Sequence, residues 1–488
     1  MPYTPFEKAF QPDSIAIVGV SRQLKPDNSP LKGLNLPDGI ETLNNIINIG
    51  FKGRLYPVNP QADSILGLRA YPSVSSLPET VDLVIVTVPN NLVPDVLEDC
   101  IKAGALNVHI MTSGFGETGQ EDDKILEKRV REIAVRGKLR LIGPNCIGLQ
   151  VPSARITTMG ILPQKPGTTA FVSQSGGHVL MMLTKLANAN LGFSKMISFG
   201  NAIILDSTDF IEYLSTDPDT EIITAYMEGV KDGRRLLDIV GRANTTKPVI
   251  IWKAGLSDSG ARAAASHTGA LGGQRQLWDA FFKQTKAIQV HNHDELVDMI
   301  TTFLYLKSVR GNAAAVLSMG GGSSVAGADV CAANGINIPP LSQSSTKQLL
   351  QRIPLVNRGV ANPLDVYDTV VQPSLIEKIL DIMVKDPVID FVIINYPAFL
   401  LDNNERNSKI IDSICRFARN NTTGKPIVYA VNTFISVDLL SATGQGLLTG
   451  LLSQKLFQSG VPVYASLESA CRSMSRFLKY KRFQDQLQ

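Results

Sequence analysis

Several things that this sequence lacks limit what the protein can be. Its five cysteines are widely scattered and form no C-x-x-C pair, which argues against a disulfide framework or a zinc site. No run approaches about 18 uninterrupted apolar residues, and the first residues contain no apolar signal segment. Lys plus Arg number 47 against 44 for Asp plus Glu, with no basic stripe among aromatics, so nucleic acid is not expected as a partner. We expect a cytoplasmic protein.

Short β-branched runs recur along the whole chain, and each is followed by a stretch with helical spacing. A length of 488 residues suggests about three domains, and 44% hydrophobic residues suit a globular protein. Strands that alternate with helices predict parallel sheets, and strands that are continuously apolar predict sheets covered on both faces. The expected fold class is therefore α/β. The runs include SIAIVGV, VDLVIVTV, NVHIMTS, TTAFVS, EIITAYME, PVIIWKAG, AAAVLSMG and DFVIINYP.

Two breaks in periodicity divide this series into three units. VPSARITTMGILPQKPG is rich in Pro and Gly and precedes the strand near Thr169, and LKSVRGN precedes the strand near Ala313. We expect domains at 1–150, 160–308 and 311–480. The second and third both open with a strand that runs into a glycine-containing turn and a helix.

The strand ends of the first unit carry short loops of small residues, several of which contain proline. Ligands bind at the carboxyl ends of strands in open parallel sheets. The first turn, after IAIVGV, lacks the full G-x-G-x-x-G fingerprint, so a nicotinamide cofactor is weakly supported. Backbone amides there can still bind phosphate, aided by Ser21, Arg22 or Lys25, although an ordinary loop is the alternative. Further loops are YPVNPQ, VTVPNN, MTSGFGETG and IGPNCIG.

In the second unit, FVSQSGGHV runs from a strand through Ser175, Gly176 and Gly177 into an apolar helix. Such a turn presents unpaired amides and the positive end of the helix dipole, and so predicts an anion site. Capping by Ser175 without a ligand is the alternative. Another strand ends at Glu228, where a lone glutamate is more often solvated than catalytic. His178, directly after SQSGG, is expected to pack rather than to bind an anion.

His267 lies in AASHTGALGG, a segment with almost no bulk for a histidine to pack against. No G-x-S-x-G elbow or ordered triad is present, and no metal site is expected. The remaining interpretation is an imidazole nucleophile toward phosphorus. A carboxylate would hold its second nitrogen, and a helix N-terminus would receive the transferred group.

Taken together and in order, these motifs resemble a known family. SHTGALGG, SQSGG, GPNCIG, SGFGE, LYPVNP and YMEGVKDGRR closely resemble the α subunit of the NDP-forming acyl-CoA synthetases, the ADP-forming acetate–CoA ligases, which are relatives of the succinyl-CoA synthetase α subunit. The similarity extends to NPLDV and GVPVYASLESACRSMSRFLKY. It implies a CoA-binding Rossmann domain followed by two flavodoxin-like ligase domains.

The resemblance also implies a reaction. Acyl-CoA, phosphate and ADP would give acid, CoA and ATP, reversibly, through an acyl phosphate and a phosphohistidine at His267. Glu228 would orient and stabilise the imidazole, while Ser175, Gly176 and Gly177 would hold the phosphoryl group. The implied CoA site comprises Gly19, Val20, Ser21, Arg22, Asn59, Pro60, Gln61, Val88, Pro89, Thr112, Ser113 and Gly114.

The sequence departs from the family pattern in the loop GNAIILDSTD, where Ile203 and Ile204 replace polar residues. Either the acyl pocket suits a more apolar substrate, or the site has drifted in use. In the same family an ATP-grasp module holds the nucleotide and Mg²⁺, and nothing in this chain resembles one. A separate ATP-grasp β subunit is therefore expected, as an α2β2 assembly. The alternatives are a CoA-binding scaffold without turnover and a CoA or carbamoyl transferase that needs no nucleotide.

Overall fold

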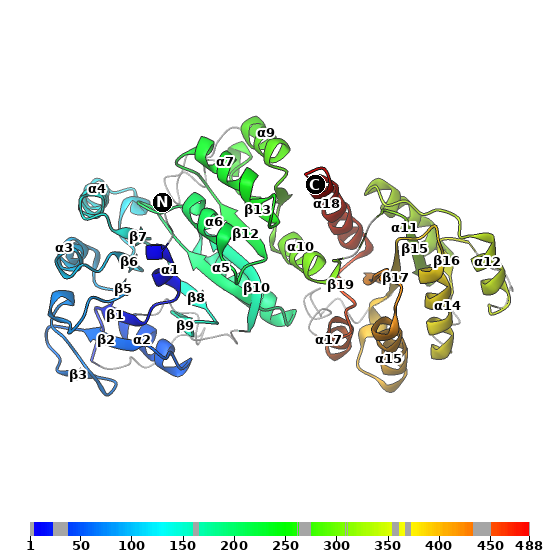
Figure 1. Ribbon diagram of the computed structural model, residues 1–488, viewed down its shortest axis with the longest axis horizontal. Helices are drawn as coiled ribbons and strands as arrows, with labels where there is room; N and C mark the ends of the chain where they lie inside the picture. The colour runs from blue at the N-terminus through cyan, green and yellow to red at the C-terminus, as the bar shows by residue number, and fades with distance from the viewer. Residues whose placement is uncertain are drawn as a thin grey trace. The chain divides into compact units, whose positions relative to one another are not determined.

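The computed structural model describes residues 4–22, 38–159, 165–260, 262, 275–307, 309, 311–353, 361–366, 372–432 and 450–487. The chain forms two compact units. The first comprises residues 1–187 and 191–292, and the second comprises residues 188–190 and 293–488. The described strands form three larger sheets and one small hairpin (Figure 1). The predicted α/β class is confirmed.

The first sheet is fully parallel, in the order β2-β1-β5-β6-β7. Its strands are Arg54–Val58, Ser14–Val18, Leu83–Val86, Asn107–Ile110 and Arg140–Ile142. Residues of β1 alternate between two clusters: Ile15 and Ile17 pack with α2, whereas Ala16 and Val18 pack with α3 and α4. This explains why the strand is continuously apolar, because both of its faces are buried. The helices are α1 (Thr4–Phe10), α2 (Gly39–Asn48), α3 (Val93–Ala103) and α4 (Glu121–Arg136), and β3 (Ser64–Ile65) pairs with β4 (Leu68–Arg69).

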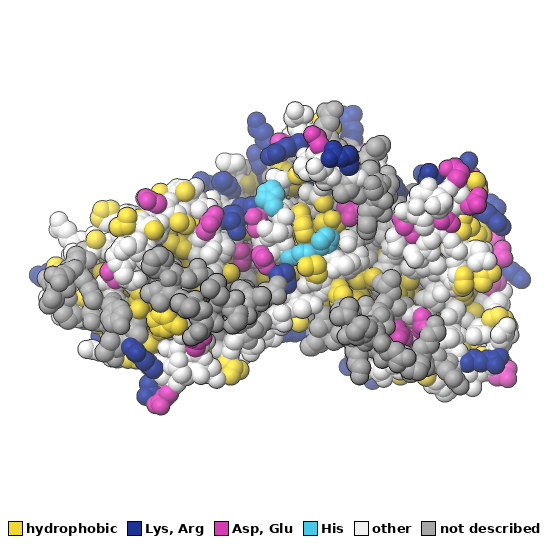
Figure 2. Space-filling view, turned by 180° about the vertical axis from the view of Figure 1, so that it is seen from behind, with side chains coloured by type: hydrophobic (Ala, Val, Ile, Leu, Met, Phe, Trp, Pro, Cys, Tyr) yellow, Lys and Arg dark blue, Asp and Glu magenta, His cyan; other side chains and the backbone are white. Residues whose placement is uncertain are grey.

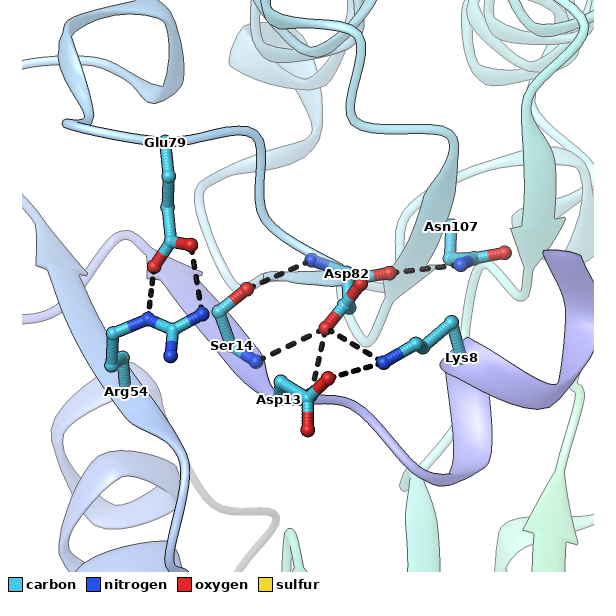
Figure 3. A network of polar contacts seen from close by, with 7 residues as sticks. All are labelled: Lys8, Asp13, Ser14, Arg54, Glu79, Asp82 and Asn107. Carbon is cyan, nitrogen blue, oxygen red and sulfur yellow. Dashed lines mark hydrogen bonds and ion pairs between the residues drawn. The ribbon is translucent and has the colours of Figure 1, made fainter.

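Polar side chains fasten the amino ends of these strands, opposite the edge where a ligand is expected (Figure 3). The Asp82 carboxylate accepts from the backbone nitrogens of Asp13, at 2.7 Å, and Ser14, at 3.3 Å. The Asn107 amide donates to the carbonyl of Asp82, at 2.8 Å. Arg54 forms a bidentate pair with Glu79 beside them. Three neighbouring strands, β1, β5 and β6, are thus held in register by one aspartate.

The second sheet of this unit has the order β14-β13-β12-β10-β11-β8-β9 and is parallel except for β8 and β9. These two strands follow directly on the first sheet, so the chain enters the second sheet at Leu149. The strands are Ile288–Val290, Val249–Lys253, Ile222–Met227, Pro166–Ser173, Phe193–Ser198, Leu149–Val151 and Ile156–Thr157. The helices are α5 (Gly176–Asn188), α6 (Ser207–Thr216), α7 (Gly233–Ala243) and α9 (Arg275–Thr285).

The second unit holds a parallel sheet in the order β16-β15-β17-β18-β19, with helices packed on both faces. Its first helix, α10 (His293–Tyr305), falls inside the segment 160–308 that the sequence assigns to the second domain. It packs on α18, and the hydroxyl groups of Thr302 and Tyr464 are hydrogen-bonded at 2.9 Å. The strands are Leu364–Asp365, Ala314–Ser318, Phe391–Pro397, Ile427–Asn432 and Val463–Tyr464, and the remaining helices are α11 (Gly321–Ala333), α12 (Gln343–Leu350), α14 (Pro373–Lys385), α15 (Glu405–Asn420), α17 (Leu451–Gln458) and α18 (Leu467–Asp485).

Candidate functional site

A cleft of about 500 Å³ opens at the carboxyl edge of the first sheet. Eight of the twelve residues proposed for CoA line it: Gly19, Val20, Ser21, Asn59, Pro60, Gln61, Val88 and Pro89. They come from the ends of β1, β2 and β5, which are adjacent strands. Residues that are up to seventy positions apart in the chain therefore meet at the carboxyl ends of neighbouring parallel strands, where ligands bind in such sheets.

Close approach of α2 to the first strand turn shapes one end of this cleft. A β-carbon at Gly39 would lie 2.5 Å from the Thr87 hydroxyl oxygen and 2.7 Å from the carbonyl oxygen of Gly19. Only glycine allows the helix to start so close to the turn. The side chain of Asp38 caps α2 by accepting from the amides of Ile40 and Glu41. That carboxylate already occupies part of the helix N-terminus, whereas Gly19, Val20 and Ser21 of the first turn line the cleft.

The other proposed CoA residues lie around the cleft rather than in its lining. The Arg22 guanidinium donates to the carbonyl oxygen of Gln61, which ties the first turn to the second. The Thr112 hydroxyl donates to the carbonyl of Val88, at 2.7 Å, and the Asn90 amide donates to that of Gly114, at 2.5 Å. Ser113 is exposed in the same loop. These contacts hold the loop after β6 against the loop after β5.

The lining of the cleft is mostly apolar. Valines and prolines from the strand ends form its walls, together with Leu92 and Val96 near the start of α3. The carboxylate of Asp99 lies at its edge but accepts from the amides of Val74, at 2.6 Å, and Ser75, at 3.1 Å. Such a cleft fits a long ligand with an apolar arm and a flat ring, and its glycine turn leaves room for a phosphate group. The residues present therefore fit CoA.

The turn before α5 is braced by a hydroxyl from the end of β10. The backbone nitrogen of Ser175 donates to the Ser173 hydroxyl, at 3.2 Å, which in turn donates to the carbonyl of Ser175, at 2.7 Å. A β-carbon at Gly176 would lie 2.6 Å from the side chain of Ile147, in the GPNCIG loop. Gly177 is exposed at the first turn of the helix. Ser173 and Ile147 thus hold the inner side of the turn, while Gly177 on its outer side is exposed to solvent.

Glu228 lies directly after β12, and the structure places it beside this turn. The side-chain oxygen of Gln174 accepts from the backbone nitrogens of Glu228, at 3.0 Å, and Gly229, at 3.3 Å. The Tyr226 hydroxyl donates to the Glu228 carboxylate, at 3.2 Å. Glu228 is 5% exposed, so it is not the solvated surface glutamate that the sequence alone favoured.

A lysine and an aromatic group complete the surroundings of Glu228. Lys253 donates to the carbonyl of Glu228, at 2.9 Å, and lies 5.1 Å from the ring centre of Trp278. Burial lowers the pKa of Lys253 to about 8, although the charge of Glu228 opposes this shift. Burial, followed by the charge of Glu228 and its hydrogen bond, raises the pKa of Tyr226, which keeps that hydroxyl protonated as a donor.

His178 packs against this group, as expected. Its ring centre lies 4.0 Å from that of Tyr226 and 4.8 Å from that of Trp252. Tyr226 and Trp252 meet edge to face at 4.9 Å. The ring therefore covers the residue that donates to Glu228 and supports the site through packing.

The loop Gly200–Asp209 has a structural role that the sequence did not reveal. Ile203 is 6% exposed and belongs to the hydrophobic cluster of β1, β5, α3 and α4, against which Ile204 also packs. Asp206 caps α6, and Asp209 pairs with Arg235 at 2.7 Å. The two isoleucines thus join the two sheets of the unit. This placement favours packing over a lining for an acyl group.

Asn201, in the same loop, was missed by the sequence analysis. Its amide donates to the carboxylates of Glu117, at 2.6 Å, and Glu127, at 2.9 Å. The Glu117 carboxylate also accepts from the backbone nitrogen of Gly114, at 2.7 Å. The loops after β6 and β11 therefore meet through one asparagine. The role of Gln174 was also missed. The one feature of the sequence that could have indicated it is its position, as a polar residue directly after a buried strand.

His267 lies outside the described residues. Among those that the structure describes, no three His, Cys, Asp or Glu side chains form a group that could hold a metal ion. Within the same ranges, none of the helices has the length and apolar composition that a membrane crossing requires.

On the face shown in Figure 2, the described Lys and Arg side chains are interspersed with Asp and Glu.

Two family models match the chain. Residues 13–152 match a CoA binding domain, and residues 166–303 match a succinyl-CoA ligase-like flavodoxin domain. The first contains the cleft at the carboxyl edge of β1, β2 and β5. The second contains the turn before α5 and Glu228.

Similar proteins match the chain over a longer range than either family model. Subunit alpha of an ADP-forming acetate–CoA ligase from Pyrococcus furiosus is 33% identical over 457 residues, which are 93% of each chain. An ADP-forming acetate–CoA ligase from Archaeoglobus fulgidus is 35% identical over 79% of this chain, which spans 54% of that protein. A dinucleotide-forming acetyl-coenzyme A synthetase from Ca. Korarchaeum cryptofilum, in complex with phosphate and ADP, matches with a TM-score of 0.81 and 28% identity over 98% of this chain and 97% of that one. With this fold, this cleft and these relatives, the chain belongs to the family of ADP-forming acetate–CoA ligase alpha subunits.

Proposed function

We propose that this chain is the α subunit of an ADP-forming acid–CoA ligase. Acyl-CoA, phosphate and ADP would be converted reversibly to acid, CoA and ATP. The relatives named above support this activity, and the Korarchaeum structure contains phosphate and ADP. The proposal assigns residues 1–150 to CoA, 160–308 to phosphoryl transfer and 311–480 to a second ligase domain.

The arrangement of Glu228 carries this proposal. Its carboxylate is buried at a strand end, and the Gln174 amide connects its backbone to the turn that precedes α5. A carboxylate fixed beside a helix N-terminus can orient an imidazole while the helix amides stabilise a phosphoryl group. Tyr226 donates to the same carboxylate and limits its rotation.

The chemical steps follow from these roles. In the CoA cleft, phosphate would attack the thioester carbonyl, and CoA would leave as the thiol. An imidazole nitrogen of His267 would then attack the phosphorus of the acyl phosphate, and the acid would leave as a carboxylate. Glu228 would stabilise the positive charge that develops on the ring, and Ser175, Gly176 and Gly177 would hold the phosphoryl group. ADP would finally accept this group.

The nucleotide would be bound by another polypeptide. The chain spans 93% of the Pyrococcus furiosus subunit alpha but about half of the Archaeoglobus fulgidus ligase. We therefore propose a separate ATP-grasp β subunit that binds ADP or ATP with Mg²⁺, in an α2β2 assembly. The acyl group would reach the first domain as its CoA thioester.

Phosphate labelling tests the proposal. The chain is incubated with its copurified partner, Mg²⁺ and γ-labelled ATP, and acid-labile, base-stable phosphate is counted on the α chain. We expect labelling of the wild type, none for His267→Asn, and at least a tenfold slower rate for Glu228→Gln. His291→Asn, a substitution of an exposed histidine in the first unit, is the matched control and should label normally.

Each alternative gives a different result. A scaffold without turnover would bind CoA and remain unlabelled with every partner. A transferase that needs no nucleotide would exchange CoA between acids without ADP. Labelling of His267→Asn at the wild-type rate would overturn the assignment of the phosphohistidine.

A further inference from the structure

The second unit contains a pocket that the proposed reaction does not use. It has a volume of about 530 Å³ and is lined by residues at the end of α11 and on one face of α18. These two helices pack together (Figure 1). The proposed CoA cleft and Glu228 belong to the first unit. The pocket is lined by Arg472, Arg476, Lys479 and Arg482 from α18, and by Asn312 and Asn334 opposite them.

The four cations follow one another along one face of α18. Their positions are i, i+4, i+7 and i+10, so each lies within one helical turn of the next. Like charges at such spacing repel one another and destabilise a helix. A negatively charged group beside this face would therefore stabilise α18.

Carboxylates of the protein offset only part of this charge. Glu295, on α10, lies 2.8 Å from Arg476 and 3.6 Å from Arg472. Glu468 lies 3.8 Å from Arg472 and is exposed. Neither Lys479 nor Arg482 has an ion-pair partner in the part of the chain that the structure describes, and both are exposed. Two positive charges therefore remain at the open end of the pocket.

The cations are also not needed to cap the helix opposite them. Basic residues often stabilise a helix C-terminus by neutralising its free carbonyl groups. Here the turn after α11 already satisfies three of the last four. Ile336 donates to the carbonyl of Cys331, Gly335 to that of Ala332, and the Asn334 side chain to that of Val330, all at 2.9 Å.

We propose that this pocket binds a small polyanion that carries at least two phosphate groups. One guanidinium group can donate two parallel hydrogen bonds to two oxygens of a phosphate, and the pocket is large enough for a small molecule. Arg472 and Arg476 lie on the inner side, whereas Lys479 and Arg482 supply the unbalanced charge. This site goes beyond the proposed function, because it lies in the unit that holds neither the CoA cleft nor Glu228.

Calorimetry on the full chain tests this site with inorganic tripolyphosphate as the probe. We expect saturable binding at one site per chain, and at least tenfold weaker binding of orthophosphate at equal ionic strength. The variant Lys479→Glu/Arg482→Glu should lose at least tenfold in tripolyphosphate affinity. Lys347→Glu/Lys378→Glu is the control, because it changes two exposed lysines of the same unit, outside the pocket, by the same charge. It should bind as the wild type does.

Two results would overturn the proposal: no saturable binding to the wild type, or an equal loss of affinity in both double variants, which would indicate a general effect of net charge. Lys479→Gln/Arg482→Gln replaces the first variant if that variant does not fold, and it should also weaken binding. CoA affinity is measured in parallel and should not change in any variant. A failure of the polyanion site is thereby distinguished from a failure of the proposed function.

Discussion

The side-chain oxygen of Gln174 lies 3.0 Å from the backbone nitrogen of Glu228, so one buried amide joins the end of β12 to the turn before α5. The same oxygen also accepts from Gly229. Two N–H groups therefore depend on a single acceptor. This contact sets the distance between a carboxylate and a helix N-terminus that come from separate strands.

Replacing Gln174 should weaken both stability and phosphoryl transfer. Gln174→Leu leaves two buried donors without an acceptor, which we expect to lower the free energy of unfolding by about 1–3 kcal/mol. Gln174→Glu keeps an acceptor of the same reach and should recover part of the lost stability, but its added charge beside Glu228 should still oppose binding of the phosphoryl group. Urea unfolding at pH 7 measures the first effect and the labelling assay measures the second. An unchanged unfolding midpoint in the leucine variant would contradict the prediction.

The sequence predicted the sheets, and eight of the residues that it proposed for CoA line one cleft, since both follow from local patterns. Ile15 and Ile17 alternate with Ala16 and Val18, and all four are buried. A strand that is apolar at every position predicts a sheet covered on both faces. The loops after such strands must then meet at one edge, so the clustering of Gly19, Asn59 and Val88 followed from topology.

What the sequence could not predict depends on contacts between distant segments. Gly39 follows a long polar segment, and nothing near it indicates that its helix would pack against Thr87. The environment of Glu228 depends on Gln174, 54 residues earlier. Ile203 belongs to the cluster of β1, β5, α3 and α4, and the order of residues does not reveal which sheet a loop packs against. Such pairings are fixed by the fold rather than by local preference.

A side chain at Gly39 should disturb the proposed CoA cleft. Gly39→Ala places a methyl group 2.5 Å from the Thr87 hydroxyl, so α2 must move away from the first turn. We expect a loss of about 1–3 kcal/mol in unfolding free energy and at least a tenfold weaker affinity for CoA, measured by calorimetry. Gly233→Ala is the control, since no atom apart from its chain neighbours and the backbone of its own helix lies within 4 Å of the added carbon at the start of α7. Equal behaviour of the two variants would contradict the close approach.

The second sheet contains a buried ion pair whose disruption should be costly. Lys195 is 0% exposed and lies 2.6 Å from Asp217, whose side chain is 2% exposed. Lys195→Met would remove the cation nearest to this carboxylate and leave only Lys247, which donates to the backbone carbonyl of Asp217, at a cost of about 3 kcal/mol in the free energy of unfolding.

The double variant Lys195→Met/Asp217→Asn removes both charges and should recover much of this loss. Urea unfolding of the single and double variants at pH 7 completes the cycle. If the double variant is less stable than Lys195→Met alone, the aspartate is held mainly by its other contacts, such as the Thr220 hydroxyl at 2.5 Å.

Asp298, on α10, should make stability fall as the pH rises. Burial raises its pKa to about 7, and the charge of Arg472 opposes this shift only in part, while Asp294 and Glu295 reinforce it. Between about pH 4 and pH 7 the unfolded chain has lost this proton while the folded chain keeps it. The folded state therefore binds more protons in this window, and its stability decreases until the carboxyl group is ionised in both states above about pH 7.

Asp298→Asn keeps the shape of the protonated carboxyl group and removes the titration. We expect it to match the wild type near pH 4 and to exceed it at pH 8 by an amount on the order of 1–4 kcal/mol in the free energy of unfolding. Asp381→Asn, at an exposed aspartate paired with Lys385, changes net charge equally and should show no such rise between pH 5 and pH 7. Urea unfolding at four pH values distinguishes the two variants. If the difference between Asp298→Asn and the wild type is constant with pH, the carboxyl group is ionised in the folded protein throughout this range, and Arg472 stabilises its charge more strongly than burial opposes it.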